Sequence, residues 1–209
     1  MAMQKYRNKY RIKSTRLQNW DYGWKGAYFI TICTHNREHY FGEIINNNMV
    51  LSEIGKIAKS EWIKTFKIRV EMNLEMGEYV IMPNHIHGII IIGDNEYNSQ
   101  QCIGRGAMHR VSTDNNHRVS ADNNHRVSAD NKFGPQSKNL ASIIRGYKSS
   151  VTTYAHKNGF DDFAWQSLFY DHIIRNEKSF NKISEYIINN PMNWKNDKFK
   201  MNNDIRPME

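Results

Sequence analysis

Residues 79–93 read YVIMPNHIHGIIIIG, two β-branched apolar runs on either side of Pro83. Isoleucine and valine favour strands, whereas proline cannot donate a hydrogen bond to the ladder between two strands. The stretch therefore predicts two buried strands, at about 69–82 and 85–93, joined by a turn at the proline.

The second strand carries two histidines, His85 and His87, separated by Ile86. Side chains two residues apart on a strand project from the same face, about 7 Å apart, so the two imidazoles point the same way. Such a pair is explained either by ordinary hydrogen-bonded histidines in a sheet or by the beginning of a metal site. Zinc is disfavoured because neither a cysteine pair nor an HExxH motif supplies further ligands. Two histidines with oxygen donors instead favour Mg²⁺ or Mn²⁺ at a phosphate.

Further elements follow from hydrophobic periodicity and from residues that begin or end helices. Ser52 can cap a helix, and Pro191 ends the last one. Strands, hairpins or extended segments are expected at 26–36, 41–52 and 163–175, and helices at 53–66, 139–157 and 176–190. This order predicts an α+β sandwich in which helices cover one face of an antiparallel sheet.

The chain divides into a core domain with three less regular segments. The core is expected at 26–192, preceded by a basic and aromatic arm at 1–25 that suits either nucleic-acid binding or a solvated leader. An insertion at 94–138 contains the octads HRVSTDNN, HRVSADNN and HRVSADNK at 109–132. Each octad has a single valine, too little apolar surface to fold alone, so a duplicated and disordered surface loop is expected. A polar tail, expected to be frayed, occupies 193–209.

Charge and cysteine content restrict the classes of function. The 209 residues include 29 Lys and Arg against 21 Asp and Glu, a net charge of +8, which favours a polyanionic partner but also suits an ordinary soluble surface. The two cysteines, Cys33 and Cys102, lack the spacing of a metal site or a disulfide framework, so we expect the protein to be located in the reducing cytoplasm. No apolar run approaches the roughly 18 residues that span a bilayer, and the basic N-terminus lacks the apolar segment of a signal peptide.

A resemblance to a known family rests on several short motifs in a fixed order. PNHIH at 83–87 resembles the HUH motif (His, a hydrophobic residue, His) of single-strand DNA endonucleases. The remaining motifs are similar to the C-terminal half of the REP-associated tyrosine transposases, which belong to the single-tyrosine HUH transposase family. They are WQ at 165–166, FYDHIIR at 169–175, EYI at 185–187 and NP at 190–191. The resemblance covers roughly residues 22–93 and 138–192, and the octad insertion departs from the family pattern without touching a motif residue.

The resemblance implies a ferredoxin-like (RRM-like) fold and a metal-dependent transposase or endonuclease that cleaves and rejoins single-stranded DNA. In that family a tyrosine attacks a phosphodiester and leaves a 5′-phosphotyrosine and a free 3′-OH, so rejoining needs no nucleotide cofactor. On this resemblance Tyr186 is the nucleophile, and His85, His87 and Asn190 hold Mg²⁺ or Mn²⁺. The partner would be single-stranded or hairpin DNA, which implies a nucleoid-associated protein in the cytoplasm with no membrane partner.

The helix expected at 176–190 provides a separate reason to pair Tyr186 with Asn190. Residues four apart lie on the same helical face, so a hydroxyl and an amide oxygen would project side by side. Without the histidine strand, the same two residues would be an interface tyrosine and a C-terminal cap asparagine. The other candidate nucleophiles, each of which also fits an apolar stripe or strand, are Tyr147, Tyr154 and Tyr170.

Arg145, Lys148 and Arg175 are the expected contacts to DNA phosphates. His172 also lies in a family motif, but an orienting or DNA-contacting role fits it as well as catalysis does, so it is not assigned to the catalytic set. The alternative function is a catalytically silent DNA- or RNA-binding protein on the same fold. Monomer and homodimer both stay open, as does whether Tyr186 serves its own histidine pair or a partner's.

Overall fold

A computed structural model describes residues 5–6, 9–10, 17, 20–99 and 137–200 of the chain. The octad repeats at 109–132, most of the N-terminal arm and the end of the polar tail lie outside these residues, so the arm and residues 100–136 of the insertion stay predictions. In the described part of the chain, no helix combines the length and the apolar character that crossing a membrane requires.

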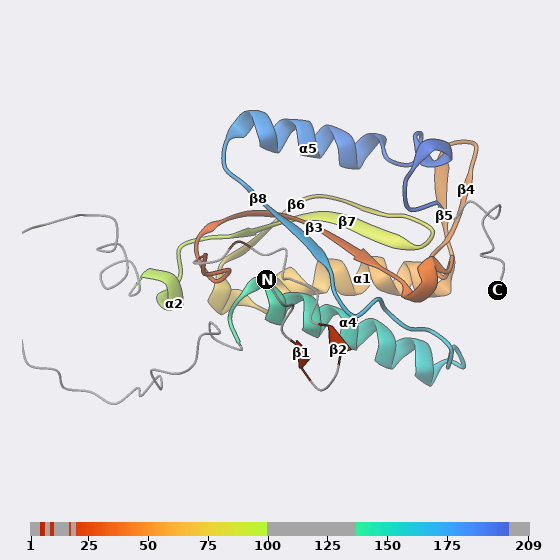
Figure 1. Ribbon diagram of the computed structural model, residues 1–209, viewed down its shortest axis with the longest axis horizontal. Helices are drawn as coiled ribbons and strands as arrows, with labels where there is room; N and C mark the ends of the chain where they lie inside the picture. Colours follow the sequence, from red (N-terminus) through yellow and green to blue (C-terminus); the bar gives the residue numbers. More distant parts are fainter. Residues whose placement is uncertain (1–4, 7–8, 11–16, 18–19, 100–136, 201–209) are drawn as a thin grey trace, which may run out of the picture.

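A four-stranded antiparallel sheet with two helices forms the centre of the fold (Figure 1). Along the chain its elements are β3 (Gly26–Cys33), α1 (Glu53–Lys67), β6 (Leu74–Ile81), β7 (His85–Ile92), α4 (Leu140–Lys157) and β8 (Tyr170–Ile174). The strands lie in the order β6-β7-β3-β8, and every neighbouring pair is antiparallel. A β-α-β-β-α-β succession with this sheet order is the ferredoxin-like arrangement, so the predicted fold class is confirmed.

Shorter elements surround this centre. β4 (Gly42–Ile45) and β5 (Asn48–Leu51) form the hairpin predicted at 41–52, and its turn places Asn46 and Asn47 in the left-handed conformation that asparagine tolerates. After β8, helix α5 (Glu177–Asn189) begins at a cap from the Asn176 side chain. The remaining elements are β1 (Lys5–Tyr6), β2 (Lys9–Tyr10), α2 (Glu96–Ser99) and the 3-10 turns η1 (His35–Arg37), η2 (Val70–Met72) and η4 (Trp194–Asn196).

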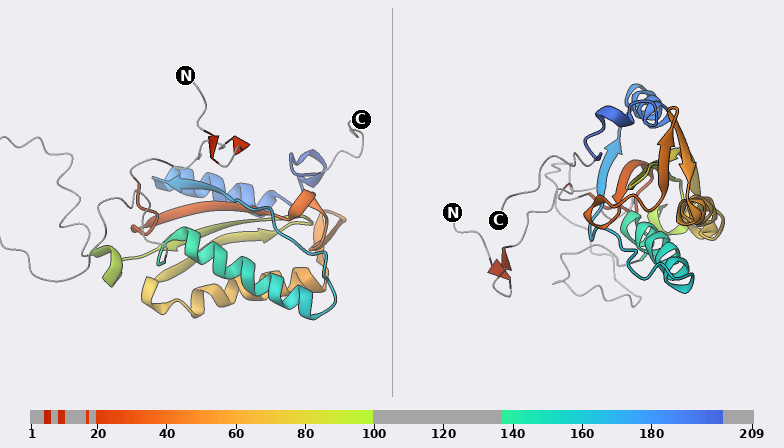
Figure 2. Two further views of the ribbon diagram at one scale, coloured as in Figure 1. Left: turned by 60° about the horizontal axis from the view of Figure 1, so that its bottom comes forward. Right: turned by 90° about the vertical axis from the view of Figure 1, so that its right-hand side faces the viewer.

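Helices cover both faces of the sheet, α1 and α4 on one side and α5 on the other, as Figures 1 and 2 show. On the first face Trp62 and Tyr147 pack in one cluster with Ile86, and on the second Ile187 packs with Ile89. The predicted sheet with one covered face is therefore wrong. The physical reason lies in β7, whose alternate isoleucines face opposite sides, because a strand buried on both faces carries a continuous apolar run.

Gly88 is the point where β7 passes closest to Trp62 of α1. A Cβ at Gly88 would lie 2.5 Å from Trp62 Cζ2, and the buried indole is held by an edge contact with Tyr147 at 5.4 Å. We expect Gly88→Ala to lower the free energy of unfolding by about 1–3 kcal/mol, measured by urea denaturation, because neither group can move away freely. Gly26→Ala in the same sheet is the control, since its Cβ would meet nothing closer than 3.6 Å. Equal losses in the two variants would contradict this account.

Three strands are shorter than the sequence predicts. The strand expected at 26–36 ends at Cys33, because His35–Arg37 form the 3-10 turn η1. The strand expected from residue 69 begins only at Leu74, because Val70–Met72 form a 3-10 turn that ends at Asn73 with a left-handed φ of 47°. The segment expected to be extended over 163–175 is a strand only in β8. Beside β3 and β6 the remaining predicted residues form 3-10 turns, whereas before β8 Trp165 forms only an isolated β-bridge with Thr34.

Two segments are folded where the sequence predicts loose chain. Residues 94–99, assigned to the insertion, belong to the domain, because Asn98 is buried and its side-chain nitrogen donates to a backbone carbonyl. The tail expected to be frayed from Lys195 is folded as far as Lys200, with Trp194 buried. The tail segment 194–200 reaches the histidine pair and therefore bears directly on the site.

Candidate active site

The turn between β6 and β7 sets the position of the histidine pair. Met82 N donates to His85 O (2.8 Å), which closes the turn around Pro83 and Asn84. After this turn His85 and His87 both project from the sheet face that α5 covers. The two side chains therefore share one face, as their spacing predicts. Both side chains are buried, so they belong to the interior of the domain.

Asn84 sets the tautomer of His85. Asn84 Nδ2 donates to Arg37 O and to Phe199 O, each at 2.9 Å. Because the amide nitrogen is the donor in both bonds, Asn84 Oδ1 is the atom that faces His85 Nδ1 at 2.8 Å, and it accepts. His85 Nδ1 therefore carries the hydrogen, and the lone pair of Nε2 is directed into the site.

The ring of His87 is directed toward the same point. His87 Nε2 lies 3.1 Å from His85 Nε2, and His87 Nδ1 lies 2.8 Å from Thr31 Oγ1, whose hydroxyl can accept from this nitrogen or donate to it. Burial lowers the pKa of His85 well below its usual value and lowers the pKa of His87 to about 3. Both imidazoles are consequently neutral at pH 7, which is the form that binds metal ions.

Tyr186 and Asn190 enter the site from α5 and its C-terminal end. Tyr186 Oη lies 3.1 Å from His87 Nε2. Asn190 is 2% exposed, and its buried Oδ1 has no hydrogen-bond partner among the described residues. Burial raises the pKa of the Tyr186 phenol, the charge of Asp197 adds to this, and the hydrogen bond with the Asn190 side chain opposes it. The structure thus brings these two residues to the histidine pair.

Asp197 is a further candidate ligand, in the segment that the sequence predicts to be a frayed tail. Its side chain is only 5% exposed, and Oδ2 lies 4.0 Å from His85 Nε2. The other oxygen, Oδ1, accepts from Phe199 N at 2.7 Å, which orients the carboxylate. One ligand atom from each of His85, His87 and Asp197 lies within 4.8 Å of the others, a spacing that could hold a metal ion. A single carboxylate in a polar tail has no sequence pattern that would have identified it.

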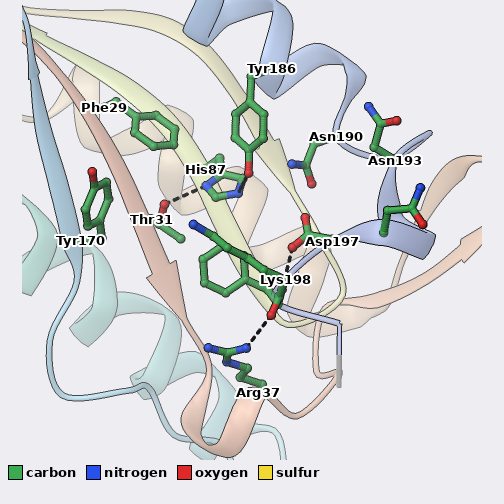
Figure 3. A pocket seen from close by; sticks show the side chains of 12 residues that line it. Phe29, Thr31, Arg37, His87, Tyr170, Tyr186, Asn190, Asn193, Asp197 and Lys198 are labelled. Carbon is green, nitrogen blue, oxygen red and sulfur yellow. Dashed lines mark hydrogen bonds between the residues drawn. The ribbon is translucent and has the colours of Figure 1, made fainter. Parts of the chain in front are cut away.

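A cavity of about 840 Å³ is lined by His87, Tyr186, Asn190 and Asp197 (Figure 3), with the buried His85 beside His87. Figure 3 shows Tyr186 reaching from α5 toward His87, with Asn190 beside it. Phe29 and Tyr170 contribute aromatic rings to the lining, and the cationic side chains in it are Arg37 and Lys198. This lining suits an anionic ligand that also has a planar apolar part.

The three residues predicted to contact phosphates lie away from this cavity. Arg145 and Lys148 are on α4, which covers the opposite face of the sheet. Lys148 Nζ donates to two backbone carbonyl groups, at 2.6 and 3.2 Å, and burial lowers its pKa to about 8. Arg175 is exposed beside a separate cavity at the far end of β8. The sequence did not single out Arg37 and Lys198, because their approach to the histidine pair depends on the folded tail.

The fold of this sheet and its helices recurs in a known class of transposase. A solved structure of a REP-associated tyrosine transposase bound to a REP hairpin has a TM-score of 0.51 and 17% sequence identity, and the match covers 88% of this chain and 74% of that chain. A candidate transposase from Deinococcus radiodurans is more distant, with a TM-score of 0.35, 12% identity, and coverage of 85% of this chain and 97% of that chain. The chain therefore has a fold similar to that of the REP-associated tyrosine transposase.

The family of the chain is given by a sequence relative. The chain is 37% identical over 187 residues to an uncharacterized protein of Haemophilus influenzae, and the match covers 88% of this chain and 91% of the relative. The chain belongs to the same family as this Haemophilus protein. No protein-family model matches the chain.

Proposed function

We propose that the chain is a metal-dependent tyrosine transposase or endonuclease that cleaves and rejoins single-stranded DNA through a 5′-phosphotyrosine intermediate. The observation that carries the proposal is the position of Tyr186 Oη, 3.1 Å from Nε2 of the buried His87 in a cavity of about 840 Å³. The similar fold of the REP-associated tyrosine transposase supports this class of reaction. Because that protein is bound to a REP hairpin, hairpin DNA is the proposed substrate, and the nucleoid the proposed location.

Mg²⁺ or Mn²⁺ is the proposed cofactor, and the side chains of the site fit such an ion. His85 Nε2 and His87 Nε2 are neutral ligands directed to one point. Asn190 Oδ1 is a buried oxygen without a partner among the described residues, and Asp197 Oδ2 lies near His85. Amide and carboxylate oxygens are the donors that hard divalent cations prefer. When bound there, the ion would neutralise and polarise the phosphate to be cleaved.

Tyr186 would act as the nucleophile. Its Oη forms a bond to phosphorus and loses the phenol proton, while the bond from phosphorus to O3′ breaks and the leaving oxygen takes up a proton as 3′-OH. Burial raises the pKa of this phenol, so the hydroxyl needs a positive neighbour in order to ionise near pH 7. Arg37 and Lys198 line the same cavity and can neutralise the phosphate oxygens. The reverse step rejoins the strand without a nucleotide, because the phosphotyrosine bond replaces the phosphodiester.

The experiment that tests this function uses one hairpin DNA labelled at either its 5′ or its 3′ end and incubated with the protein and Mn²⁺. A 5′-phosphotyrosine joins the protein to the downstream fragment, so the 3′ label should migrate with the protein on a denaturing gel. The 5′ label should instead appear on a shorter strand with a free 3′-OH. If the hairpin is bound and neither product forms, the chain is a catalytically silent binding protein instead.

Asn190→Ala should raise the Mn²⁺ concentration needed for half-maximal cleavage by about tenfold or more, because a metal site that loses an oriented ligand loses affinity. Asn190→Asp should retain or strengthen metal affinity, since a carboxylate is the stronger hard-oxygen ligand. The measurement is cleavage against Mn²⁺ concentration, together with calorimetric Mn²⁺ titration of the DNA-free protein. Asp197→Asn, which removes charge without removing volume, should also weaken Mn²⁺ binding in the same titration.

Asn193→Ala is the matched control for these variants. Asn193 lines the same cavity, but its side-chain nitrogen donates to Asn189 O at 3.0 Å. Its removal should leave the metal titration unchanged. Titration curves of Asn190→Ala that superimpose on those of the parent would exclude Asn190 as a ligand and make it only a helix-terminal residue before Pro191.

A further inference from the structure

A row of aromatic side chains leads along the cavity away from His87 (Figure 3). Phe29 stacks on His87, with ring centroids 5.4 Å apart, and meets Tyr170 edge to face at 6.3 Å. Tyr170 ends the row and is 53% exposed. An exposed aromatic ring in a cavity that Arg37 and Lys198 also line offers a surface on which another π system can stack.

Strand register fixes the place of Tyr170 relative to His87. In the sheet Thr31 is paired directly with His87 on one side and with Tyr170 on the other. Directly paired residues project from the same face, and neighbouring strands lie about 4.8 Å apart, so Tyr170 and His87 stand about 10 Å apart on one face. That spacing is comparable to the reach from a phosphate to the base of an adjoining nucleotide.

The loop before Tyr170 is held by α4. Lys148 Nζ donates to Gln166 O at 2.6 Å and to Leu168 O at 3.2 Å. Trp165 Nε1 in turn donates to Lys148 O at 3.1 Å. These bonds fix the backbone just before Tyr170, so little conformational entropy remains to be lost when a ligand stacks on its ring. The same bonds account for the position of Lys148 without any phosphate.

We propose that Tyr170 is a base-stacking residue, which holds an unpaired nucleobase next to the phosphodiester presented to Tyr186. Single-stranded DNA is the occupant because the cavity combines an exposed aromatic ring with the cations Arg37 and Lys198. Aromatic platforms beside positive charge are how proteins hold single strands without reading their sequence. The inference rests on the proposed function for the identity of the reacting phosphodiester, whereas the stacking itself requires no cleavage.

The test measures the affinity of a fluorescein-labelled oligothymidylate by anisotropy, without divalent metal and on the full chain carrying Tyr186→Phe. Adding Tyr170→Ala should weaken binding about tenfold, the scale of one base–aromatic stack. Adding Tyr170→Phe should leave the affinity within about twofold, because the ring is kept. The matched control is Leu168→Ala, which removes an exposed apolar side chain of the same loop that does not line the cavity, and it should have no effect.

The outcomes separate this inference from the proposed function. The stacking assignment is overturned if adding Tyr170→Ala leaves the affinity of the Tyr186→Phe chain unchanged, or if Tyr170→Phe weakens binding as much as Tyr170→Ala does. It is also overturned if the Tyr186→Phe chain itself does not bind. As a second measurement, an oligothymidylate with 5-iododeoxyuridine at its centre is mixed with the Tyr186→Phe chain and irradiated, and the crosslink should map to Tyr170. Crosslinks confined to other residues would overturn the assignment. If Tyr170→Ala weakens binding but the wild-type chain forms no adduct with hairpin DNA, the cleavage function fails and the stacking residue stands.

Discussion

The Tyr186→Phe variant is expected to form no covalent adduct with hairpin DNA, a loss on the order of 10⁴-fold or more in the cleavage rate. Phenylalanine keeps the ring that packs near Phe29 and His87 but lacks the oxygen that would attack phosphorus. His87 Nε2 keeps its 3.1 Å contact with His85 Nε2, and residue 186 is half-exposed, so the fold should be retained. Hairpin affinity should therefore stay close to that of the parent.

The adduct is measured as a shift of 3′-labelled hairpin on a denaturing gel in the presence of Mn²⁺. Tyr154→Phe is the matched control, because Tyr154 lies on α4 on the other face of the sheet. Tyr147 is a poor alternative nucleophile, since it is buried and its hydroxyl donates to Ala58 O at 2.9 Å. A full-strength adduct from Tyr186→Phe would move the nucleophile to another tyrosine, and Tyr170 would be tested next because it lines the same cavity.

The double variant His85→Ala/His87→Ala is expected to lose Mn²⁺ binding, with a decrease in affinity of at least about 100-fold. The physical reason is that the two imidazoles converge on one point, whereas Asn190 and Asp197 alone leave a weak oxygen site. Calorimetric titration of the DNA-free protein measures the binding, and cleavage should fall to background in parallel. The chelator EDTA should abolish cleavage by the parent in the same way.

His172→Ala is the control for the histidine variant, because His172 is exposed and lines a different cavity. The double variant also leaves Asn84 Oδ1 and Thr31 Oγ1 without their imidazole partners, at a cost of about 1–3 kcal/mol for each buried group. Circular dichroism therefore accompanies the titration, and His87→Gln alone serves as the milder substitution. Undiminished cleavage by the parent in EDTA would contradict the metal assignment altogether.

Local periodicity was enough to predict most helices and strands of the core. It also predicted which side chains share a face of each element. Ser52, Asn139 and Asn176 cap α1, α4 and α5 where the helices were expected to begin, because a side-chain oxygen can satisfy a free amide at the first turn. The strand limits were less well predicted, since the 3-10 turn at Val70–Met72 contains the same apolar residue types as a strand. The number of covered faces was wrong, because an apolar run shows that a strand is buried and not what buries it.

Periodicity did not predict the positions of the tail residues or of the lysine side chains. Asp197 and Lys198 lie in a polar segment with no repeating pattern, and only the folded chain brings them to the cavity of His87. Lys148 was expected to contact DNA phosphates, yet its ammonium group donates to two carbonyl groups of a loop. Such contacts depend on where a loop returns to a helix, which neighbouring residues in the chain do not encode.

By itself the sequence determined that two pairs of side chains each share one face of their strand or helix, because the backbone of each element has a fixed period. A period of two residues puts His85 and His87 on one face of a strand, and four residues return Asn190 to the helical face of Tyr186. Only the tertiary structure decided that the two pairs meet. The contact between Tyr186 Oη and His87 Nε2 joins residues 99 apart in the chain, and it exists because α5 packs over the second face of the sheet. Backbone repeats set directions over a few residues, whereas the distance between two elements is set by the packing of all the side chains between them.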